Sequence, residues 1–427
     1  MERLTQFVSE HINDDTTRLI MNRSKWPEID IDLAVNCIES RRKLKGKMQE
    51  WCDEPRLIFP RRLSAEQCSS SATGAYKAEF ASRIIPNFKL ADLTGGLGVD
   101  SWFFSKKASQ ILYCEMLPEL CNAAEHNFEV LRASNITVRN VAVSTSSEPE
   151  EDVFRTPGEI LSNFEPDIVY MDPARRGEGG KKVFLLEDCL PDVLTLKDEI
   201  FKYTNHILLK LSPMADITMV CERLGKTCRE VHVVAAGGEC KELLVWMDKE
   251  WADDYMIHAV ELHKDGTPGV FSFTPAEEKA CRIATEKTPE LDSKGQTHDS
   301  DESILYLFEP GKALMKAGAF NLVAERFPLS KLGKSTHYYI FTDAGQIPCL
   351  QSHGKVFEIL RLEQLDKRSI KAFGKDFPKA EVTARNIPMD TDTLRKKLGV
   401  ASGDNTHIFG LKSDSHGNLL IATEVLR

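Results

Sequence analysis

The sequence predicts an α/β fold, in which a doubly wound, Rossmann-like sheet follows a helical domain and precedes smaller α+β modules. Two patterns indicate this. Short apolar runs alternate with helical stretches between residues 72 and 249. The last two runs are separated only by the segment Gly237 to Lys241, which is too short for a helical crossover. The two final strands are therefore expected to form an antiparallel hairpin at the end of the sheet.

Length and composition exclude several classes of protein. The chain has 427 residues, of which 42% are hydrophobic and 28% charged, and its formal net charge is -10. At roughly 100 to 200 residues per domain, it holds two to four domains. No apolar run approaches the roughly 18 residues of a membrane span, and residues 1–20 lack the apolar core of a secretory signal. We expect a soluble, cytoplasmic protein without a membrane partner. The net acidity argues at first against a nucleic-acid partner.

Residues 1–71 are predicted to form the helical domain, because their apolar residues lie near helical spacing and no strand-like alternation appears. Basic residues outnumber acidic ones by 8 to 3 between residues 41 and 62. Two interpretations of this excess remain open. It is either a solvated helix face or a surface that contacts nucleic acid.

The core of the protein is predicted over residues 72–252. In an open α/β sheet, ligands bind at the carboxyl ends of the strands, so the residues that follow each strand are candidates for a site. Seven apolar segments are expected to form the strands, namely residues 90–93, 111–115, 136–140, 167–172, 206–212, 230–236 and 242–248.

The strongest functional motif directly follows the first strand and reads DLTGGLG over residues 92–98. Glycines let the backbone approach a ligand closely, and the N-terminus of the following helix favours electronegative groups. The second strand ends in Glu115, 23 residues after Asp92. An acid at this position of a doubly wound sheet accepts hydrogen bonds from ribose hydroxyls. The motif therefore predicts a nucleoside-containing cofactor.

The loop departs from a dinucleotide site in an informative way. Thr94 and Val99 stand where the outer glycines of G-x-G-x-x-G would be, and Asp92 precedes the loop, so a pyrophosphate would meet a carboxylate. A ligand with a cationic end fits better. S-adenosylmethionine (AdoMet) has ammonium and sulfonium groups for the loop, a ribose for the acid that ends the second strand, and an adenine that would pack beside Met116 and Val141.

A second motif, DPARR over residues 172–176, ends the fourth strand at the carboxyl edge of the central sheet. The proline fixes the backbone there. The Asp172 carboxylate would hold and polarise an amino group that receives a methyl group. Lys210, on the fifth strand, is a further candidate for the substrate mouth, whereas Lys241 and Glu242 are expected to form a surface salt pair.

Together, the glycine loop, Glu115, the DPARR segment and the terminal hairpin resemble a class I AdoMet-dependent methyltransferase. The resemblance implies AdoMet as cofactor, with Glu115 on its ribose. It implies that Asp172, Pro173 and Arg175 face the substrate. It also implies a cofactor loop made of Asp92, Thr94, Gly95, Gly96 and Gly98.

Residues 63–80 resemble the helix that precedes the core in trimethylguanosine-synthase-like enzymes and closes over the methionine end of the cofactor. Ser70, Thr73 and Tyr76 would then contact the cofactor. The alternative, that they only start and pack the helix, remains open.

The segment 253–335 is predicted to combine a linker at residues 285–302 with a small ferredoxin-like α+β module, with a strand at 304–308 and a helix at 310–326. Residues 336–427 resemble the THUMP-like extension of a bacterial group of methyltransferases with the same DPARR motif. THUMP-type domains occur in RNA-modifying enzymes, so the resemblance implies structured RNA as substrate. The extension carries a basic stripe that includes Lys367, Arg368, Lys371, Lys375, Lys379, Arg385, Arg395, Lys396 and Lys397.

The leading hypothesis is an AdoMet-dependent methyltransferase that modifies a base nitrogen in tRNA or rRNA. Two alternatives remain: a non-catalytic RNA-binding or assembly protein that keeps the fold, and a methyltransferase for a protein or small molecule. Uracil C5 chemistry is disfavoured, because Ser212 follows the fifth strand where a cysteine nucleophile is needed. No metal is assigned, since the histidines show no ligand spacing.

Overall fold

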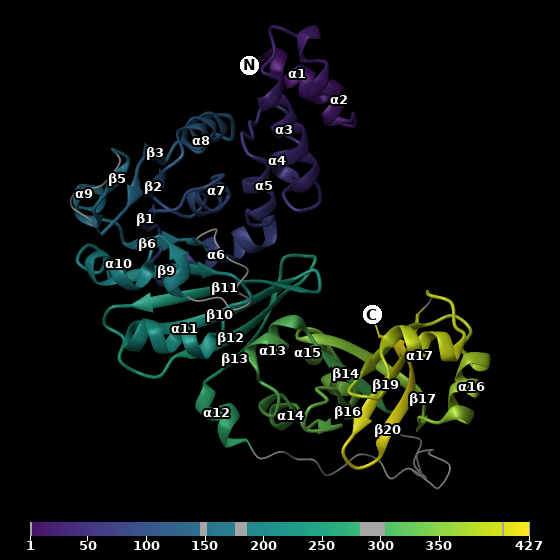
Figure 1. Ribbon diagram of the computed structural model, residues 1–427. Coiled ribbons are helices and arrows are strands. Elements are labelled where there is room, and N and C mark those ends of the chain that lie inside the picture. The colour runs from purple at the N-terminus through teal and green to yellow at the C-terminus, as the bar shows by residue number, and fades with distance from the viewer. Residues whose placement is uncertain (1, 146–151, 176–185, 282–303, 404, 427) are drawn as a thin grey trace. The chain divides into compact units, whose positions relative to one another are not determined.

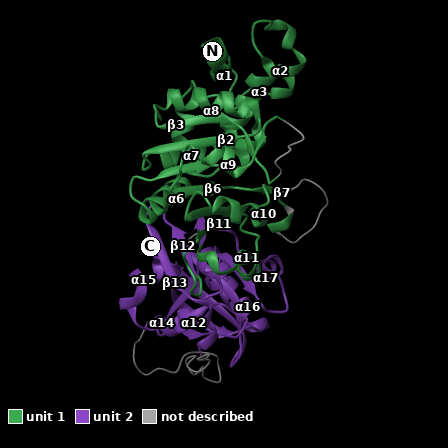
Figure 2. Cartoon of the chain, turned by 90° about the vertical axis from the view of Figure 1, so that its left-hand side faces the viewer, with its two compact units in different colours: residues 1–231, 241–255 green, residues 232–240, 256–427 purple. Residues whose placement is uncertain are grey.

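The computed structural model describes residues 2–145, 152–175, 186–281, 304–403 and 405–426, so the linker predicted at 285–302 lies outside the described residues. The chain forms two compact units, shown in Figure 2. Unit 1 comprises residues 1–231 and 241–255, and unit 2 comprises residues 232–240 and 256–427. Among the described residues, no helix combines the length and apolarity that crossing a membrane requires.

Unit 1 opens with the expected helices (purple in Figure 1). Two of them begin at aspartates whose side chains accept a backbone hydrogen bond in the first turn: Asp15 before α2 and Asp30 before α3. The helices are α1 (Glu2–Glu10), α2 (Thr16–Met21), α3 (Ile31–Leu44), α4 (Gln49–Cys52) and α5 (Arg62–Gln67).

The basic side chains of these helices are largely engaged within the protein. Arg41 is only 9% exposed and donates hydrogen bonds to four carbonyl oxygens between Cys52 and Leu57. Arg42 donates to two carbonyl oxygens of the α1–α2 connection. Arg41 thus serves the packing of this domain, whereas most of the other basic residues are exposed, as the interpretation of a solvated face expects. Further ion pairs are Lys43–Glu66, Arg56–Glu54, Arg61–Glu119 and Arg62–Glu39.

The seven predicted core strands all form, in the order β10-β11-β9-β6-β1-β2-β3. The strands β3, β2, β1, β6 and β9 are mutually parallel, and β11 runs antiparallel to β9, which confirms a mixed sheet that ends in a hairpin. Their bounds are β1 (Lys89–Asp92), β2 (Gln110–Glu115), β3 (Ile136–Asn140), β6 (Ile168–Met171), β9 (His206–Leu211), β10 (Cys228–Ala236) and β11 (Glu239–Asp248).

The sheet has nine strands rather than the seven predicted. The antiparallel hairpin of β12 (Met256–Leu262) and β13 (Pro268–Phe273) extends it beyond β10. The sequence does not predict this hairpin as part of the sheet, because its residues alternate between buried and accessible positions and lack the continuous apolar runs of the central strands. Two short ladders pair β4 (Ala142–Val143) with β5 (Phe154–Arg155), and β7 (Ala174–Arg175) with β8 (Cys189–Leu190).

Helices flank the central strands (Figure 1), as a sheet buried on both faces requires. The helix α6 packs tightly on α7, since a Cβ on Gly74 would lie 2.2 Å from the ring of Phe103. The helices are α6 (Ser71–Ile84), α7 (Val99–Ser105), α8 (Pro118–Val130), α9 (Pro157–Leu161), α10 (Val193–Ile200) and α11 (Ile217–Leu224).

Unit 2 contains a second sheet with the strand order β15-β16-β14-β17-β20-β19-β18. The strands are β14 (Tyr306–Pro310), β15 (Ser330–Lys331), β16 (Tyr339–Phe341), β17 (Gly354–Gln364), β18 (Glu381–Arg385), β19 (Thr406–Ser413) and β20 (Gly417–Val425). The helices are α12 (Pro275–Ala280), α13 (Lys312–Ala317), α14 (Leu322–Arg326), α15 (Ile347–Gln351), α16 (Lys367–Asp376) and α17 (Thr391–Leu398).

The single helix predicted at 310–326 is in fact two helices. Gly318 adopts the left-handed conformation, with φ 85°, and ends α13 before α14 begins. The sequence also gives no separate helix for the first half of the basic stripe, which the structure folds into α16.

The helices α16 and α17 cover the same face of this sheet. Phe373 of α16 and Leu394 of α17 belong to one buried cluster that includes Ile408 and Leu420 of the strands. The two helices approach so closely that a Cβ on Gly374 would lie 1.9 Å from the carbonyl oxygen of Leu398. Their outward faces therefore present their charged residues side by side.

Candidate functional site

The glycines of the loop between β1 and α7 serve two purposes. A Cβ on Gly95 would lie 2.2 Å from the ring of Tyr113, and one on Gly98 would lie 2.8 Å from the ring of Phe128. Gly96 has φ 55°, and a Cβ there would meet only the Thr94 carbonyl oxygen, at 3.8 Å. Gly95 and Gly98 thus let the loop settle onto the aromatic rings, while the space beside Gly96 stays open to a ligand.

Glu115, at the end of β2, holds the loop directly. Its two carboxylate oxygens accept hydrogen bonds from the backbone N–H of Gly96, at 2.8 Å, and of Leu117, at 3.0 Å. Each oxygen keeps a second lone pair, so the group can still accept two hydroxyl hydrogens. These residues therefore fit a ribose.

Asn140 links the ends of β2 and β3, where Met116 and Val141 are expected to lie beside an adenine. Its amide donates to the carbonyl oxygens of Glu115, at 2.9 Å, and Met116, at 3.0 Å. The Met116 residue is 46% exposed, and Val141, which follows β3, is half-buried. An accessible apolar surface thus lies next to Glu115.

Asp92 lies beneath the loop and not on its open side. It is 1% exposed, and its carboxyl oxygens accept hydrogen bonds from the Thr94 backbone N–H at 3.0 Å and the Ser101 hydroxyl at 2.6 Å. Burial, together with the nearby carboxylates of Asp100 and Asp172, raises the pKa of Asp92 to about 7 against the lowering effect of these two bonds. Its evident role in the structure is to shape the loop.

The Asp172 segment is joined to the glycine loop. The Thr94 hydroxyl accepts a hydrogen bond from the backbone N–H of Asp172 at 2.6 Å. The Asp172 side chain is 39% exposed, and one of its oxygens accepts a hydrogen bond from the Lys210 ammonium. Pro173 is buried. Arg175 lies in β7, and its side chain falls outside the described part of the structure. The two sequence motifs thus meet at one edge of the sheet.

A buried network of charges lies behind Asp172 and carries residues that the sequence does not single out. The Lys77 ammonium, on α6, is fully buried and contacts Glu242 at 2.6 Å and Asp100 at 3.3 Å. Asp100 also accepts hydrogen bonds from the Tyr170 hydroxyl, at 2.7 Å, and the Ser69 hydroxyl, at 3.0 Å. We call Lys77, Asp100, Tyr170, Lys210 and Glu242 the buried charge network.

The expectation that Glu242 pairs on the surface with Lys241 is wrong, because Glu242 is 2% exposed and bonded to Lys77. Lys210 belongs to the same environment. Burial alone would lower the pKa of its ammonium, but the negative charges of Asp172, Asp100 and Glu242 raise it well above its ordinary value. The network therefore favours the charged form of Lys210 inside the protein.

The candidate cofactor contacts on α6 act in the helix itself. Ser70 is the N-cap: its hydroxyl oxygen accepts a hydrogen bond from the Thr73 backbone N–H, and the Thr73 hydroxyl accepts one from the Ser70 backbone N–H, at 3.1 Å. Thr73 and Tyr76 are buried, at 1% and 7% exposed. This geometry supports the helix-start interpretation, and a cofactor role for Ser70, Thr73 and Tyr76 stays a prediction.

The histidines are less dispersed than their spacing suggests. His232 of β10 and His258 of β12 stack with ring centroids 4.5 Å apart, and the Nδ1 atom of His258 lies 2.7 Å from the Ser272 hydroxyl. The pair joins strands that are distant in sequence, which is why a spacing rule does not reveal it.

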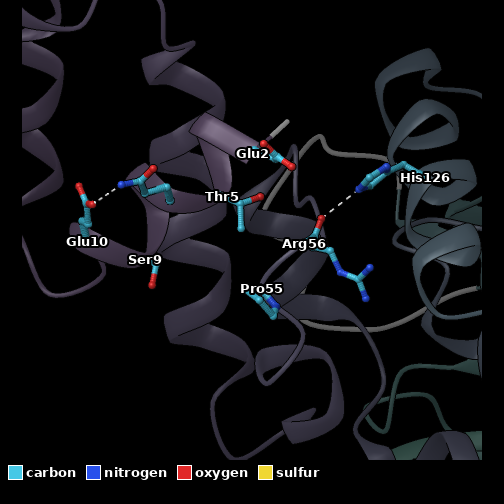
Figure 3. Close-up of a pocket in the computed structure, with 8 residues that line it drawn as sticks. Glu2, Thr5, Ser9, Glu10, Pro55, Arg56 and His126 are labelled. Atoms are coloured by element: carbon cyan, nitrogen blue, oxygen red, sulfur yellow. Dashed lines mark hydrogen bonds between the residues drawn. The ribbon is translucent and has the colours of Figure 1, made fainter.

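A cavity of about 510 Å³ lies elsewhere in unit 1, between α1, α8 and the segment before α5 (Figure 3). Glu2, Glu10, Arg56 and His126 line it together with smaller side chains, and the His126 ring contacts the Arg56 carbonyl oxygen at 2.9 Å. None of the site residues named above lines this cavity. This cavity is therefore separate from the candidate site.

Comparison with solved structures decides the family. A candidate methyltransferase from Porphyromonas gingivalis W83 is similar over 100% of this chain and 98% of its own, with 30% identity and a TM-score of 0.80. The chain belongs to this methyltransferase-like family. Family patterns match residues 306–347 as a ferredoxin-like domain and residues 354–424 as THUMP domain-like, which confirms both C-terminal modules.

Other similar structures cover only part of the chain. An rRNA methylase from Streptococcus thermophilus covers 41% of this chain and 94% of its own, with 10% identity and a TM-score of 0.29. A candidate methyltransferase from Streptococcus mutans in complex with SAH covers 40% and 95%, with 13% identity and a TM-score of 0.28. At such scores neither protein indicates what this chain acts on. A search of curated proteins found no match.

Replacing Lys77 by Met should destabilise the protein by about 3 to 5 kcal/mol, because it leaves two buried carboxylates without their cation. Urea denaturation measures the change. The matched control is Lys107→Met, whose partner Glu79 is 60% exposed and whose loss should cost less than about 0.5 kcal/mol. Equal effects of the two substitutions would contradict a stabilising role of the buried charge network.

Asp92 should make stability fall as pH rises. Its pKa is about 7 in the folded protein, above the ordinary value of about 3.9 for an unfolded chain, so the folded state binds more protons between these values. Its contribution is therefore most favourable below about pH 4 and is lost as pH rises through about 7.

The measurement compares melting temperatures of the wild type and Asp92→Asn from pH 5 to pH 8. Asn keeps an oxygen for the Thr94 N–H and does not ionise in this range. The wild type should lose stability relative to the variant as pH increases. Parallel curves would show that Asp92 does not titrate there.

Proposed function

We propose that this protein is an AdoMet-dependent methyltransferase that methylates a base nitrogen in structured RNA. The observation that carries the proposal is the half-exposed carboxylate of Asp172, a residue whose backbone N–H is bonded to the Thr94 hydroxyl of the glycine loop. An acid at this edge can accept a hydrogen bond from an amino group and orient its nitrogen toward the cofactor side of the sheet.

The residues at the loop fit AdoMet. Glu115 has acceptor capacity left for two ribose hydroxyls, and the open side of Gly96 admits close contact with the backbone. Met116 offers an exposed apolar surface for the adenine. When bound, AdoMet supplies a methyl group on a positively charged sulfur. The chain's own contribution is to hold the acceptor at Asp172.

An RNA substrate is supported by the outward faces of α16 and α17. Lys367, Arg368, Lys371 and Lys375 are exposed on α16, and Lys396 and Lys397 are exposed on α17. Both helices lie on one face of the sheet of unit 2, within the THUMP domain-like region. A cluster of lysines on adjacent helices suits a phosphate backbone. This face accounts for RNA binding despite the net negative charge of the whole chain.

Two measurements test the activity. Calorimetry should show that AdoMet binds the purified protein, and that Glu115→Ala weakens this binding by at least about tenfold through loss of the ribose hydrogen bonds.

Nucleoside mass spectrometry of RNA from cells with and without the gene should show one modified nucleoside missing, and Asp172→Ala should fail to restore it. An absence of AdoMet binding would exclude the proposed cofactor. Full restoration by Asp172→Ala would favour a non-catalytic RNA-binding role.

The double substitution Lys371→Glu/Lys375→Glu should weaken binding of total tRNA roughly tenfold at moderate salt and make binding less dependent on salt, because fewer phosphate counterions are released. Fluorescence anisotropy over a salt series measures both effects. The control Lys264→Glu/Lys279→Glu makes the same change of charge at exposed sites of unit 2 outside the THUMP domain-like region. If both variants lose the same affinity, the effect comes from overall charge and not from the face formed by α16 and α17.

A further inference from the structure

We propose that Lys210 is a positioning residue that fixes the orientation of the Asp172 carboxylate and thereby favours a methyl acceptor that donates a hydrogen bond to it, here the N–H of a base. This inference rests on the proposed function and specifies the acceptor chemistry of the same site.

Asp172 is bonded to the protein through one carboxylate oxygen and its backbone, and the rest of its side chain is accessible to solvent. One carboxylate oxygen accepts a hydrogen bond from Lys210, and the backbone N–H is bonded to Thr94. The side chain nevertheless stays 39% exposed, whereas that of Lys210 is 11% exposed. The ammonium thus approaches from within the protein, and the accessible part of the carboxylate faces the position of a substrate.

The surroundings favour a cation at this position. The Lys210 side chain is 11% exposed, and the negative charges of Asp172, Asp100 and Glu242 hold the pKa of its ammonium well above its ordinary value. The ammonium donates to one Asp172 oxygen and so fixes the orientation of the carboxylate, which leaves the other oxygen as a hydrogen-bond acceptor.

Lys210 is itself held by the buried charge network. Asp100 and Glu242 raise its pKa together with Asp172, and these two carboxylates also contact Lys77. Positive and negative groups therefore alternate from Glu242 on β11 to Asp172. Charges that are held in place by contacts within the protein favour electrostatic preorganisation of the site.

An acceptor with an N–H group can satisfy the exposed oxygen of Asp172. A carboxylate or a carbonyl oxygen has no hydrogen to donate and would face a fixed negative charge. The geometry therefore favours an exocyclic amino group or a neutral ring N–H of a base over an acidic protein side chain. Transfer of the methyl group to such a nitrogen breaks the bond between carbon and sulfur in AdoMet, and the N–H proton leaves to the adjacent Asp172 carboxylate or to water.

The test compares Lys210→Met, Lys210→Arg and the control Lys202→Met, whose lysine pairs with Glu199 on the surface. Transfer of label from methyl-labelled AdoMet to RNA of cells that lack the gene gives kcat, and calorimetry gives the Kd of AdoMet. Lys210→Met should lower kcat by at least about 100-fold and change this Kd by less than about threefold. Lys210→Arg should restore much of kcat, because it keeps the charge, and Lys202→Met should resemble the wild type.

A double-mutant cycle separates positioning from a general loss of structure. In an Asp172→Asn background, Lys210→Met should cause no further loss of kcat, since its effect acts through Asp172. Additive losses, or a failure of Lys210→Arg to recover activity, would overturn the proposal. A large increase in the Kd of AdoMet for Lys210→Met would also overturn it, because the lysine would then serve the cofactor.

Urea denaturation of the wild type, Lys210→Met, Asp172→Asn and the double variant provides a readout that is independent of activity. Coupling between the two substitutions shows that the ion pair exists in solution, and its absence overturns the positioning role. If the pair is coupled but the wild type transfers no methyl group to RNA, the proposed function fails, and the acceptor assignment fails with it.

Discussion

The buried ammonium of Lys77 holds together the parts of unit 1 on which the candidate site depends. It lies on α6, before the first strand of the sheet, and it contacts Asp100 on the helix that follows the glycine loop and Glu242 on the last strand of the hairpin. Two carboxylates and an ammonium can be buried only when they satisfy one another. The positions of α6, the glycine loop and β11 are therefore set by a single group.

The network reaches the site through two further contacts. Tyr170 lies two residues before Asp172, and its hydroxyl donates a hydrogen bond to Asp100. Lys210 donates to Asp172 and lies in the field of Asp100 and Glu242. The Thr94 hydroxyl also accepts a hydrogen bond from the Asp172 backbone N–H and so joins this residue to the glycine loop. The cofactor side and the substrate side of the proposed site thus share one rigid support, which suits chemistry that depends on alignment.

The sequence predicts the central strands well because burial on both faces leaves continuous apolar runs, as in residues 111–115 and 206–212. It fails where the information lies in pairs that are far apart. Glu242 looks like a surface residue beside Lys241, and only its partner Lys77, 165 residues away, explains its burial. Arg41 cannot be told apart from its exposed basic neighbours for the same reason, since the carbonyl groups that it binds give no signal in composition. The loop and the DPARR segment were identifiable from residue types alone, whereas the bond between them depends on backbone geometry.

The separation between Lys77 and Glu242 also bears on how the chain is made. A ribosome releases α6 long before it releases β11, and β11 lies between β9 and β10 in the sheet. Until the last of these strands has left the exit tunnel, Lys77 lacks one carboxylate partner and β9 lacks its antiparallel neighbour. The N-terminal helices can form early, but the core cannot close around its buried charges until about 250 residues have been synthesised, because a contact between distant segments forms only after the later one exists. The hairpin is thus the last element that the chain must supply before the native contacts of Lys77 can all form.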